Sequence, residues 1–443
     1  MSVVSAQKAR SRSSEMKGGS HLRCASCGDA YQLKEPVVHC RCGGLLDVAH
    51  DLSRWHGRGE GLKALFRSRL LSGKEADASG VWRFRELVLP GFPLKSMVTR
   101  GEGNTRHYSF RKTGEWMGQP NVVFKHEGEN PTGSFKDRGM TVAVSRAKAD
   151  GAKRVVCAST GNTAAAVASY ASLAGLPSAI LIPENATALG KISQSLAYGA
   201  TTIKIRGDFD AALRLVMESR EKLGLTVLNS VNPFRLEGQK TIMFEALERM
   251  GWNPPDWIVV PGGNLGNTSA FGKAFTEAKE IGLIDRLPRI AVIQAEGASP
   301  FFHSYSDGWK PYKMEAETVA TAIRIGDPVN RDKAVRAVDA TDGLVASVTD
   351  TEIMDAKAIV DSDGVGAEPA SCTSAAGIRK LVAEGVIKRD ERVLAILTGN
   401  LLKDPDATIK YHSESLPDIM SASPNRPVTI DPTARALEKV LSS

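Results

Sequence analysis

Short apolar runs typical of β-strands alternate with helix-like segments over most of the chain. The β-like runs cover residues 122–126, 154–157, 178–182, 201–205, 226–228, 257–260, 290–294 and 393–397. Helical patterns fit between most of these runs, for example at residues 163–174 and 208–223. Strands connected through helices run parallel, and the helices then cover both faces of the sheet. The alternation therefore predicts an α/β fold with its active site at the carboxyl ends of the strands.

The size and composition of the chain exclude several classes of protein. It has 443 residues, of which 42% are apolar, so it can bury a core large enough for two or three domains. No apolar run approaches the roughly 20 residues of a membrane span, and the first residues lack the apolar core of a secretory signal. Six cysteines in so long a chain do not make a disulfide scaffold. We therefore expect a cytoplasmic protein with no membrane partner.

The net charge of +7 comes partly from residues 1–20, a segment rich in serine, lysine and arginine. Such a composition predicts a disordered, solubilising basic arm. A nucleic-acid-binding arm or a short transit peptide is the alternative. Because a mildly basic enzyme with phosphorylated ligands needs no other explanation for its charge, we expect no nucleic-acid partner.

Four cysteines near the start form two pairs that suit a metal ion. The pairs are Cys24 with Cys27 and Cys40 with Cys42, and each lies beside a glycine. Four thiolates on two such turns favour a tetrahedral structural zinc, although the second pair has one intervening residue instead of two. A metal-free cysteine cluster is the alternative. We predict a zinc ribbon, because a segment this short cannot build a core of its own.

Residues 130–140 place a lysine in the first turn of a predicted helix. Turn-forming residues follow the β-like run at 122–126, and Ser134 suits the N-cap position. The helix dipole and burial would both lower the pKa of Lys136, which would make it a nucleophile suited to a carbonyl cofactor. On spacing alone, a lysine that snorkels from an ordinary helix start is the stronger interpretation.

A glycine-rich loop at residues 261–267 follows a β-like run and opens a helix from about Thr268. Consecutive backbone N–H groups in such a loop converge on an anion, and the helix N-terminus adds a favourable field. Taken alone, a strand-to-helix turn without a ligand remains the stronger interpretation.

Four stretches, in this order along the chain, resemble the threonine synthase family. They are residues 130–140, 159–163, 261–267 and 398–405. The resemblance runs from about Cys24 to the Lys403 region, and four ordered motifs are a specific signal. This family consists of pyridoxal-phosphate (PLP) enzymes of fold type II. It implies two doubly wound, mostly parallel sheet domains, here preceded by a zinc-ribbon-like segment.

The resemblance also implies roles for individual residues. Lys136 is the catalytic lysine that binds PLP, Asn162 contacts the phenolic oxygen of the cofactor, and Thr398 contacts its pyridine nitrogen. The implied cofactor-binding residues are Lys136, Asn162, Gly262, Gly263, Asn264, Leu265, Gly266, Asn267 and Thr398. The implied substrate-binding residues are Ser159, Thr160, Thr163, Ser230 and Arg235.

The segment at 229–240 resembles the part of the family that holds the phosphate of the substrate. Arginine suits a phosphate dianion because its planar fork donates two parallel hydrogen bonds. Lys240 is either a further helper at that phosphate or a solvated residue, and we expect the second. In the stretch at 159–163, Thr160 or Asn162 is expected to cap the helix that begins there.

The function implied is conversion of O-phospho-L-homoserine and water to L-threonine and phosphate by a PLP-dependent enzyme, with a homodimer as the expected assembly. A sibling PLP enzyme, such as a threonine or serine dehydratase or a cysteine or cysteate synthase, is the alternative. A nucleotide- or nucleic-acid-binding protein with a zinc ribbon is a more remote one.

We expect six segments along the chain. They are the basic arm at 1–20, the zinc-ribbon-like segment at 21–50, a connector with part of the large domain at 51–120 and a helical piece near 62–71, a mainly small PLP domain at 121–235, the large PLP domain at 236–415, and a tail at 416–443.

Overall fold

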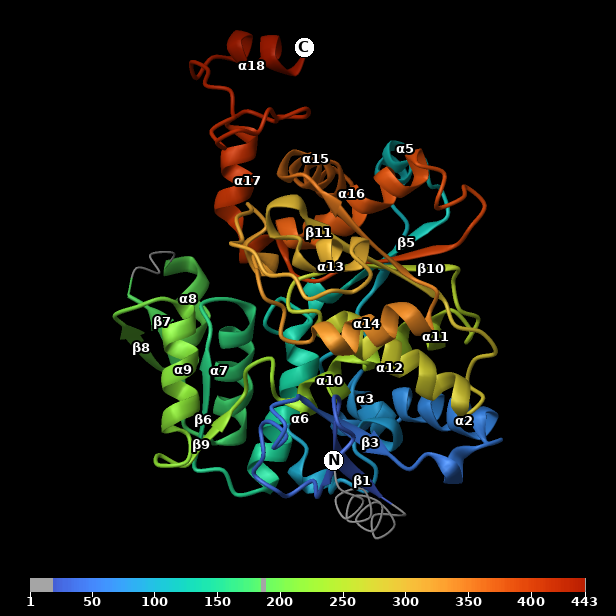
Figure 1. Ribbon diagram of the computed structural model, residues 1–443. Helices are drawn as coiled ribbons and strands as arrows, with labels where there is room; N and C mark the ends of the chain where they lie inside the picture. Colours follow the sequence, from blue (N-terminus) through green and yellow to red (C-terminus); the bar gives the residue numbers. More distant parts are fainter. Residues whose placement is uncertain (1–18, 185–188, 443) are drawn as a thin grey trace.

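The computed structural model describes residues 19–184 and 189–442, so most of the predicted basic arm lies outside the described residues. Within them the strands form three sheets (Figure 1). The strands are β1 Ser20–Cys24, β2 Ala30–Tyr31, β3 Leu46–His50, β4 His107–Tyr108, β5 Val122–His126, β6 Arg154–Ala158, β7 Ser178–Pro183, β8 Thr201–Ile205, β9 Leu225–Val227, β10 Trp257–Pro261, β11 Arg289–Ala295, β12 Leu344–Val348 and β13 Val393–Leu397.

The largest sheet has the strand order β12-β11-β10-β13-β5-β4. All its pairs are parallel except β4 with β5, in which His107 lies opposite Lys125. The central strands β10 and β13 are buried along their whole length, as expected for strands covered by helices on both faces. A second sheet, β8-β7-β6-β9, is entirely parallel.

Helices cover both of these sheets, which confirms the predicted α/β fold with two mostly parallel sheets. In Figure 1 the smaller sheet lies on the left with α7, α8 and α9, whereas α5, α15 and α16 lie over the top of the larger sheet. The helices are α2 Gly59–Leu70, α3 Glu75–Ala78, α4 Arg85–Val88, α5 Arg111–Met117, α6 Lys136–Ala149, α7 Asn162–Ala174, α8 Leu189–Ala197, α9 Phe209–Ser219, α10 Pro233–Gln239, α11 Thr241–Arg249, α12 Gly266–Glu280, α13 Pro300–Ser306, α14 Arg331–Ala340, α15 Asp350–Ser362, α16 Pro369–Ala383, α17 Pro405–His412 and α18 Ala434–Leu441.

The predicted strands agree with the observed ones to within one residue, because continuous apolar runs between turn residues carry a strong local signal. β4 and β12 were not predicted. The helix expected at 62–71 is Gly59–Leu70, and the one expected at 208–223 ends at Ser219. The division of the chain into six segments stays a prediction.

The first strands form the third sheet, with the order β2-β1-β3 and antiparallel pairing. Cys24 lies opposite Leu46 in this ladder, and both side chains are buried. The ribbon segment, which we define as residues 20–50, packs beneath α10, α12 and α14 in Figure 1. At the other end of the molecule, α18 stands away from the body.

None of the helices in the described part of the chain combines the length and the apolar character needed to span a lipid bilayer.

Candidate active site

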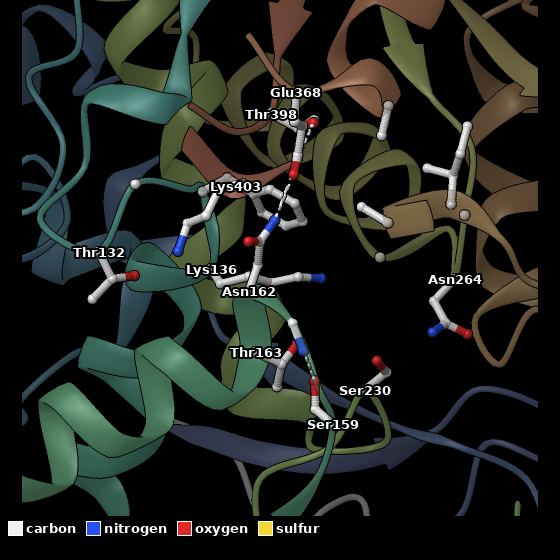
Figure 2. A pocket seen from close by; sticks show the side chains of 18 of the residues that line it. Thr132, Lys136, Ser159, Asn162, Thr163, Ser230, Asn264, Glu368, Thr398 and Lys403 are labelled. Carbon is white, nitrogen blue, oxygen red and sulfur yellow. Dashed lines mark hydrogen bonds between the residues drawn. The ribbon is translucent and has the colours of Figure 1, made fainter. Parts of the chain in front are cut away.

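A cavity of about 1050 Å³ lies where the carboxyl ends of both parallel sheets meet, and the four motif loops line it (Figure 2). The loops follow β5, β6, β10 and β13, as expected for open parallel sheets. Two of them are joined by backbone hydrogen bonds. The N–H of Phe135 donates to the carbonyl of Thr398 at 3.0 Å, and the N–H of Asn400 donates to that of Gly133 at 2.9 Å. These bonds hold the turn at residues 130–136, which carries Lys136, against the loop at residues 398–405.

Lys136 is the first residue of α6, and its side chain points into the cavity in Figure 2. Burial, together with the nearby Arg235, lowers the pKa of Lys136 to about 7, while Glu368 opposes this shift. The amine also lies 4.3 Å from the centre of the Phe135 ring. Phe135, not Ser134, occupies the N-cap position, and the Ser134 hydroxyl only accepts a long bond of 3.4 Å from the Lys136 N–H. The prediction that Ser134 caps this helix was wrong.

The glycine-rich loop turns tightly between β10 and α12. A Cβ at Gly262 would lie 2.7 Å from a methyl group of Val292, so only glycine allows this approach to β11. Leu265 is buried and has a φ of 60°, a left-handed conformation that a branched side chain rarely adopts. The helix begins at Gly266, two residues before the predicted start at Thr268. The loop thus brings its backbone N–H groups and the positive end of a 15-residue helix to the cavity.

Asn162 and Thr398 meet at a carboxylate that the sequence did not reveal. The Asn162 amide donates to Glu368 at 3.1 Å, and the Thr398 hydroxyl donates to the same carboxylate at 3.3 Å. Burial raises the pKa of Glu368, although Asn162 and Lys403 oppose the shift. Glu368 stands directly before Pro369, the first residue of α16, and no motif marks it. Only the fold brings it beside residues 30 and 206 positions away.

Ser159, Thr160 and Thr163 line the cavity at the start of α7, and their role in binding the substrate stays a prediction. The Ser159 hydroxyl accepts a bond from the N–H of Gly161 at 3.3 Å. Gly161 occupies the N-cap position, and no side chain caps the helix there, so the expected capping by Thr160 or Asn162 was wrong. The free N–H groups of this helix start face a region where an anion can bind.

Arg235 lies on α10, is 3% exposed, and lines the cavity together with Ser230. Its guanidinium donates to the carbonyl of Leu228 at 3.2 Å, while its buried Nε has no hydrogen-bond partner among the residues that the structure describes. Burial lowers the pKa of Arg235 to about 10. Within residues 19–184 and 189–442, no carboxylate forms an ion pair with this arginine. A buried cation without a counter-ion is costly, so this place in the cavity suits an anionic ligand group.

Two further lysines, Lys403 and Lys240, have surroundings that the sequence did not predict. Lys403 belongs to a motif but was assigned no role; it lines the cavity and donates to the Gln194 side chain, which itself donates to the carbonyl of Thr132 at 3.3 Å. Burial lowers the pKa of Lys403. Lys240 was expected to be solvated, which was wrong. It is fully buried between two carboxylates, those of Glu237 and Glu277, because α10 and α12 pack against each other there.

The four ribbon cysteines come together as predicted. Their sulfur atoms all lie within 4.8 Å of one another, and the Cys24–Cys42 and Cys27–Cys40 pairs are each 3.5 Å apart. Tetrahedral zinc with Zn–S bonds of about 2.3 Å would place its sulfurs about 3.8 Å apart. Burial alone would raise the pKa of Cys24, but N–H donors such as that of Cys27 outweigh it and lower the pKa to about 7. The cluster fits a structural zinc ion.

The cavity also fits pyridoxal phosphate. A buried, weakly basic amine is available for the aldehyde at Lys136, and an amide and a hydroxyl are available for the ring at Asn162 and Thr398. The N–H of Gly262 donates to the carbonyl of Ile293 at 2.7 Å, so the N–H groups from residue 263 to residue 267 are the ones suited to hold the phosphate. Each donor matches one functional group of the cofactor.

Comparison with known proteins agrees with this chemistry. The model of the family described as "Pyridoxal-phosphate dependent enzyme" matches residues 98–399. The threonine synthase of Methanocaldococcus jannaschii is 45% identical over 399 residues, which cover 89% of this chain and 95% of that protein. The threonine synthase of Methanosarcina acetivorans is 46% identical over 410 residues, or 91% and 96% of the two chains.

Solved structures share the fold. The threonine synthase of Escherichia coli has a TM-score of 0.68 at 18% identity, covering 95% of this chain and 99% of that one. Maize serine racemase has a TM-score of 0.58 at 26% identity, covering 70% and 93%. Given the extent and identity of the sequence matches, the chain belongs to the threonine synthases, within the family of pyridoxal-phosphate-dependent enzymes.

Proposed function

We propose that this chain converts O-phospho-L-homoserine and water to L-threonine and inorganic phosphate. The family supports this reaction class, and one observation carries the choice of a phosphorylated substrate. Arg235 is a buried cation in the cavity, and no carboxylate of the described chain pairs with it. A phosphate on the substrate would supply the missing anion and accept bonds from the guanidinium fork.

Lys136, Asn162, Thr398 and the loop at 262–267 would hold pyridoxal phosphate. When bound, the cofactor withdraws electrons from the substrate amino acid and so makes its Cα and Cβ protons removable. Glu368 lies between Asn162 and Thr398 and fixes the direction of both side chains. The ring therefore meets side chains that are already oriented, which lowers the entropic cost of binding.

The substrate has two anionic ends, and the cavity offers a place for each. Arg235 and Ser230 would bind the phosphate, while Ser159, Thr160 and Thr163 at the start of α7 would bind the carboxylate. Because both ends are held, the carbon that loses the phosphate and the carbon that accepts water stay near Lys136.

Lys136 would carry the protons. With a pKa near 7 its amine can both accept and release a proton at neutral pH. The positive charge of Arg235 favours the neutral, accepting form, and a bound phosphate would weaken that effect. Binding of the substrate phosphate would thus raise the pKa of Lys136 and make its amine a stronger base.

The test compares the wild type with Arg235→Ala on phosphohomoserine, threonine and serine. Loss of a buried charged partner costs on the order of 2–5 kcal/mol, or roughly 30-fold to several thousand-fold in kcat/KM for phosphohomoserine. The absorption of bound PLP should persist, because other residues anchor the cofactor. Arg214→Ala, an exposed arginine of α9, serves as the matched control and should behave as the wild type.

A wild-type enzyme that deaminates threonine or serine readily and ignores phosphohomoserine would contradict the proposal and favour a dehydratase. Equal turnover of phosphohomoserine by wild type and Arg235→Ala would contradict the assigned phosphate site.

We also propose a cytoplasmic homodimer. None of the six cysteines, all within the described residues, forms a disulfide, which agrees with a reducing compartment. Sedimentation equilibrium of the purified enzyme tests the assembly, and a monomer at micromolar concentration would contradict it.

A further inference from the structure

The ribbon segment is attached to the catalytic body by buried charges, in addition to its own cysteine cluster. Lys333 of α14 donates to the carbonyl of Leu46 at 2.7 Å and pairs with Asp47 at 2.6 Å. Lys273 of α12 donates to the carbonyl of Val48, the second residue before the end of β3. The strand β3 is thereby fixed to two helices, one of which begins at the cofactor loop.

The end of β3 reaches a group of five side chains, all buried except the partly exposed Lys273, that we call the His50–Glu237 cluster: His50, Glu237, Lys240, Lys273 and Glu277. His50 Nε2 lies 2.6 Å from a carboxylate oxygen of Glu237. Lys240 lies 2.6 Å from Glu237 and 2.7 Å from Glu277, and Lys273 pairs with both carboxylates. Glu237 is therefore the point where the ribbon segment, α10 and α12 meet.

Charge balance shows what kind of cluster this is. His50, Glu237 and Glu277 have ligand atoms close enough for a metal ion, but the two ammonium groups of Lys240 and Lys273 already neutralise the two carboxylates. Burial, with Lys240 beside it, lowers the pKa of His50 and keeps it neutral. Its Nε2–H then donates to Glu237, and its Nδ1 accepts from the hydroxyl of Ser20 at 2.7 Å.

α10 carries this contact on one face and the active site on the other. Arg235 and Gln239, four positions apart, line the cavity, while Glu237 between them points to the cluster. The helix is also seated tightly on α6, because a Cβ at Gly238 would lie 1.7 Å from the carbonyl oxygen of Arg138. α6 thus holds the helix on one side, and the bond from His50 to Glu237 holds it from the ribbon segment.

We propose that His50 of the ribbon segment is a positioning residue for Arg235, acting through Glu237 and the orientation of α10. The inference rests on the proposed function, in which Arg235 binds the phosphate of the substrate. In that case the ribbon segment has two roles. It is a folding unit, and it also influences the affinity of the site for phosphate. Glu237 keeps both lysine partners when His50 is removed, so the helix stays folded and loses one of the contacts that set its orientation, the one from the ribbon segment.

The experiment measures competitive inhibition of the PLP-loaded enzyme by inorganic phosphate, together with KM and kcat for phosphohomoserine. In His50→Ala we expect the inhibition constant of phosphate and the KM to rise by the same factor, about 3- to 30-fold. The PLP dissociation constant, the zinc content and kcat should change less than about 2-fold, since the cofactor loop and the cysteine cluster keep their contacts.

Two variants control for a general effect of removing a histidine. His56→Ala removes an exposed contact with Glu280 of α12, 3.0 Å long, and should leave the phosphate inhibition constant unchanged. His50→Gln keeps an N–H donor near the position of Nε2 and should recover most of the phosphate affinity.

A double-mutant cycle tests the route of action. In an Arg235→Ala background, His50→Ala should produce no further rise in KM, because the group it positions is absent. Additive effects would overturn the inference. So would an unchanged phosphate inhibition constant in His50→Ala, or equal impairment of His50→Ala and His50→Gln. If Arg235→Ala itself leaves phosphate inhibition unchanged, the proposed function fails; if Arg235→Ala weakens inhibition and His50→Ala does not, only the inference fails.

Discussion

The reactivity of Lys136 depends on its surroundings more than on its place in a helix. The sequence placed it in a first helical turn, and burial in the cavity and the charge of Arg235 account for a pKa near 7. Glu368 partly opposes both effects from the other side of the site. At an exposed helix start the dipole alone would lower the pKa of a lysine only slightly from its ordinary value of about 10.4. The low pKa of Lys136 therefore results mainly from tertiary contacts.

This pKa predicts the pH dependence of cofactor uptake. Only the neutral amine can attack the aldehyde of PLP, so the uptake rate of the cofactor-free protein should rise with pH and level off above about 7. Below that value the rate should fall about 10-fold per pH unit. Stopped-flow absorbance after mixing with PLP measures this, and a rate still rising between pH 8 and 10 would contradict the pKa.

Lys136→Ala should lose both the absorption of bound PLP and nearly all turnover, whereas Lys153→Ala, an exposed lysine, should retain both.

The ribbon segment and α10 show how single elements limit the range of tolerated changes. Three short strands and four thiols make the ribbon segment, whose small size leads us to expect that its folding depends on a metal. α10, in contrast, packs so closely on α6 that its position 238 has no room for a side chain. Both elements therefore depend on contacts that few amino-acid substitutions would preserve.

Removal of the metal should destabilise the ribbon segment before the catalytic body. Cys27→Ser takes away one of four ligands, and we expect the zinc content to fall from about one ion per chain towards zero and the thermal midpoint to drop by several degrees. Ser26→Ala, which keeps all four thiols, is the control. Metal analysis and differential scanning calorimetry provide the measurements. Full zinc content in Cys27→Ser would show that Cys27 is not a ligand.

A pair of glycine substitutions separates steric cost from helix propensity. Gly238→Ala should destabilise the protein by about 1–3 kcal/mol or more, because its methyl group would overlap the Arg138 carbonyl. Gly61→Ala, in the open interior of α2, should stabilise it by about 0.5–1 kcal/mol. Denaturant unfolding of both variants measures the difference, and equal effects would contradict the close packing of α10 on α6.

Across the whole molecule, a buried charge network connects segments that are distant in the chain. Glu127 and Glu245 hold Arg138 between them at 2.6 and 3.0 Å, and Lys125 lies 2.6 Å from Glu245. Glu245 also accepts bonds from the N–H groups of residues 104 and 105. The network therefore joins four parts of the chain around Arg138: β5, α6, α11 and the turn before β4.

Glu245→Gln should cost about 3–5 kcal/mol of stability, because it leaves buried cations with one carboxylate fewer. Burial alone would raise the pKa of Glu245, but Arg138 and Lys125 outweigh it and hold that pKa well below its usual range. Its stabilising effect is therefore complete above about pH 4.3, the pKa in the unfolded chain, and is lost as the pH falls below that value.

Urea unfolding at pH 7 and at pH 4 measures both effects. The variant and the wild type should differ most at pH 7. Glu221→Gln breaks an exposed pair with Arg220 and should change stability by less than about 0.5 kcal/mol. A loss of that small size in Glu245→Gln would contradict the importance of the network.

The sequence by itself determined most strands of the two parallel sheets, the order of the motif loops, the place of Lys136, the glycine-rich turn and the paired cysteines. These are local properties, because an apolar run, a turn residue or a short spacing acts within a few positions of the chain. Parallel strands then bring their carboxyl ends to one edge, so the loops at 130–140, 159–163, 261–267 and 398–405 had to meet.

Only the tertiary structure decided which charges are buried and what they face. Lys240 looked like a solvated helix residue and is enclosed by two carboxylates, while Glu368 carried no motif and lies among the cavity side chains. His50 reaches Glu237 across 187 positions of sequence. The free energy of a buried charge depends on the local dielectric and on partners that come from elsewhere in the chain. Neither can be predicted from the residues that neighbour it in the sequence.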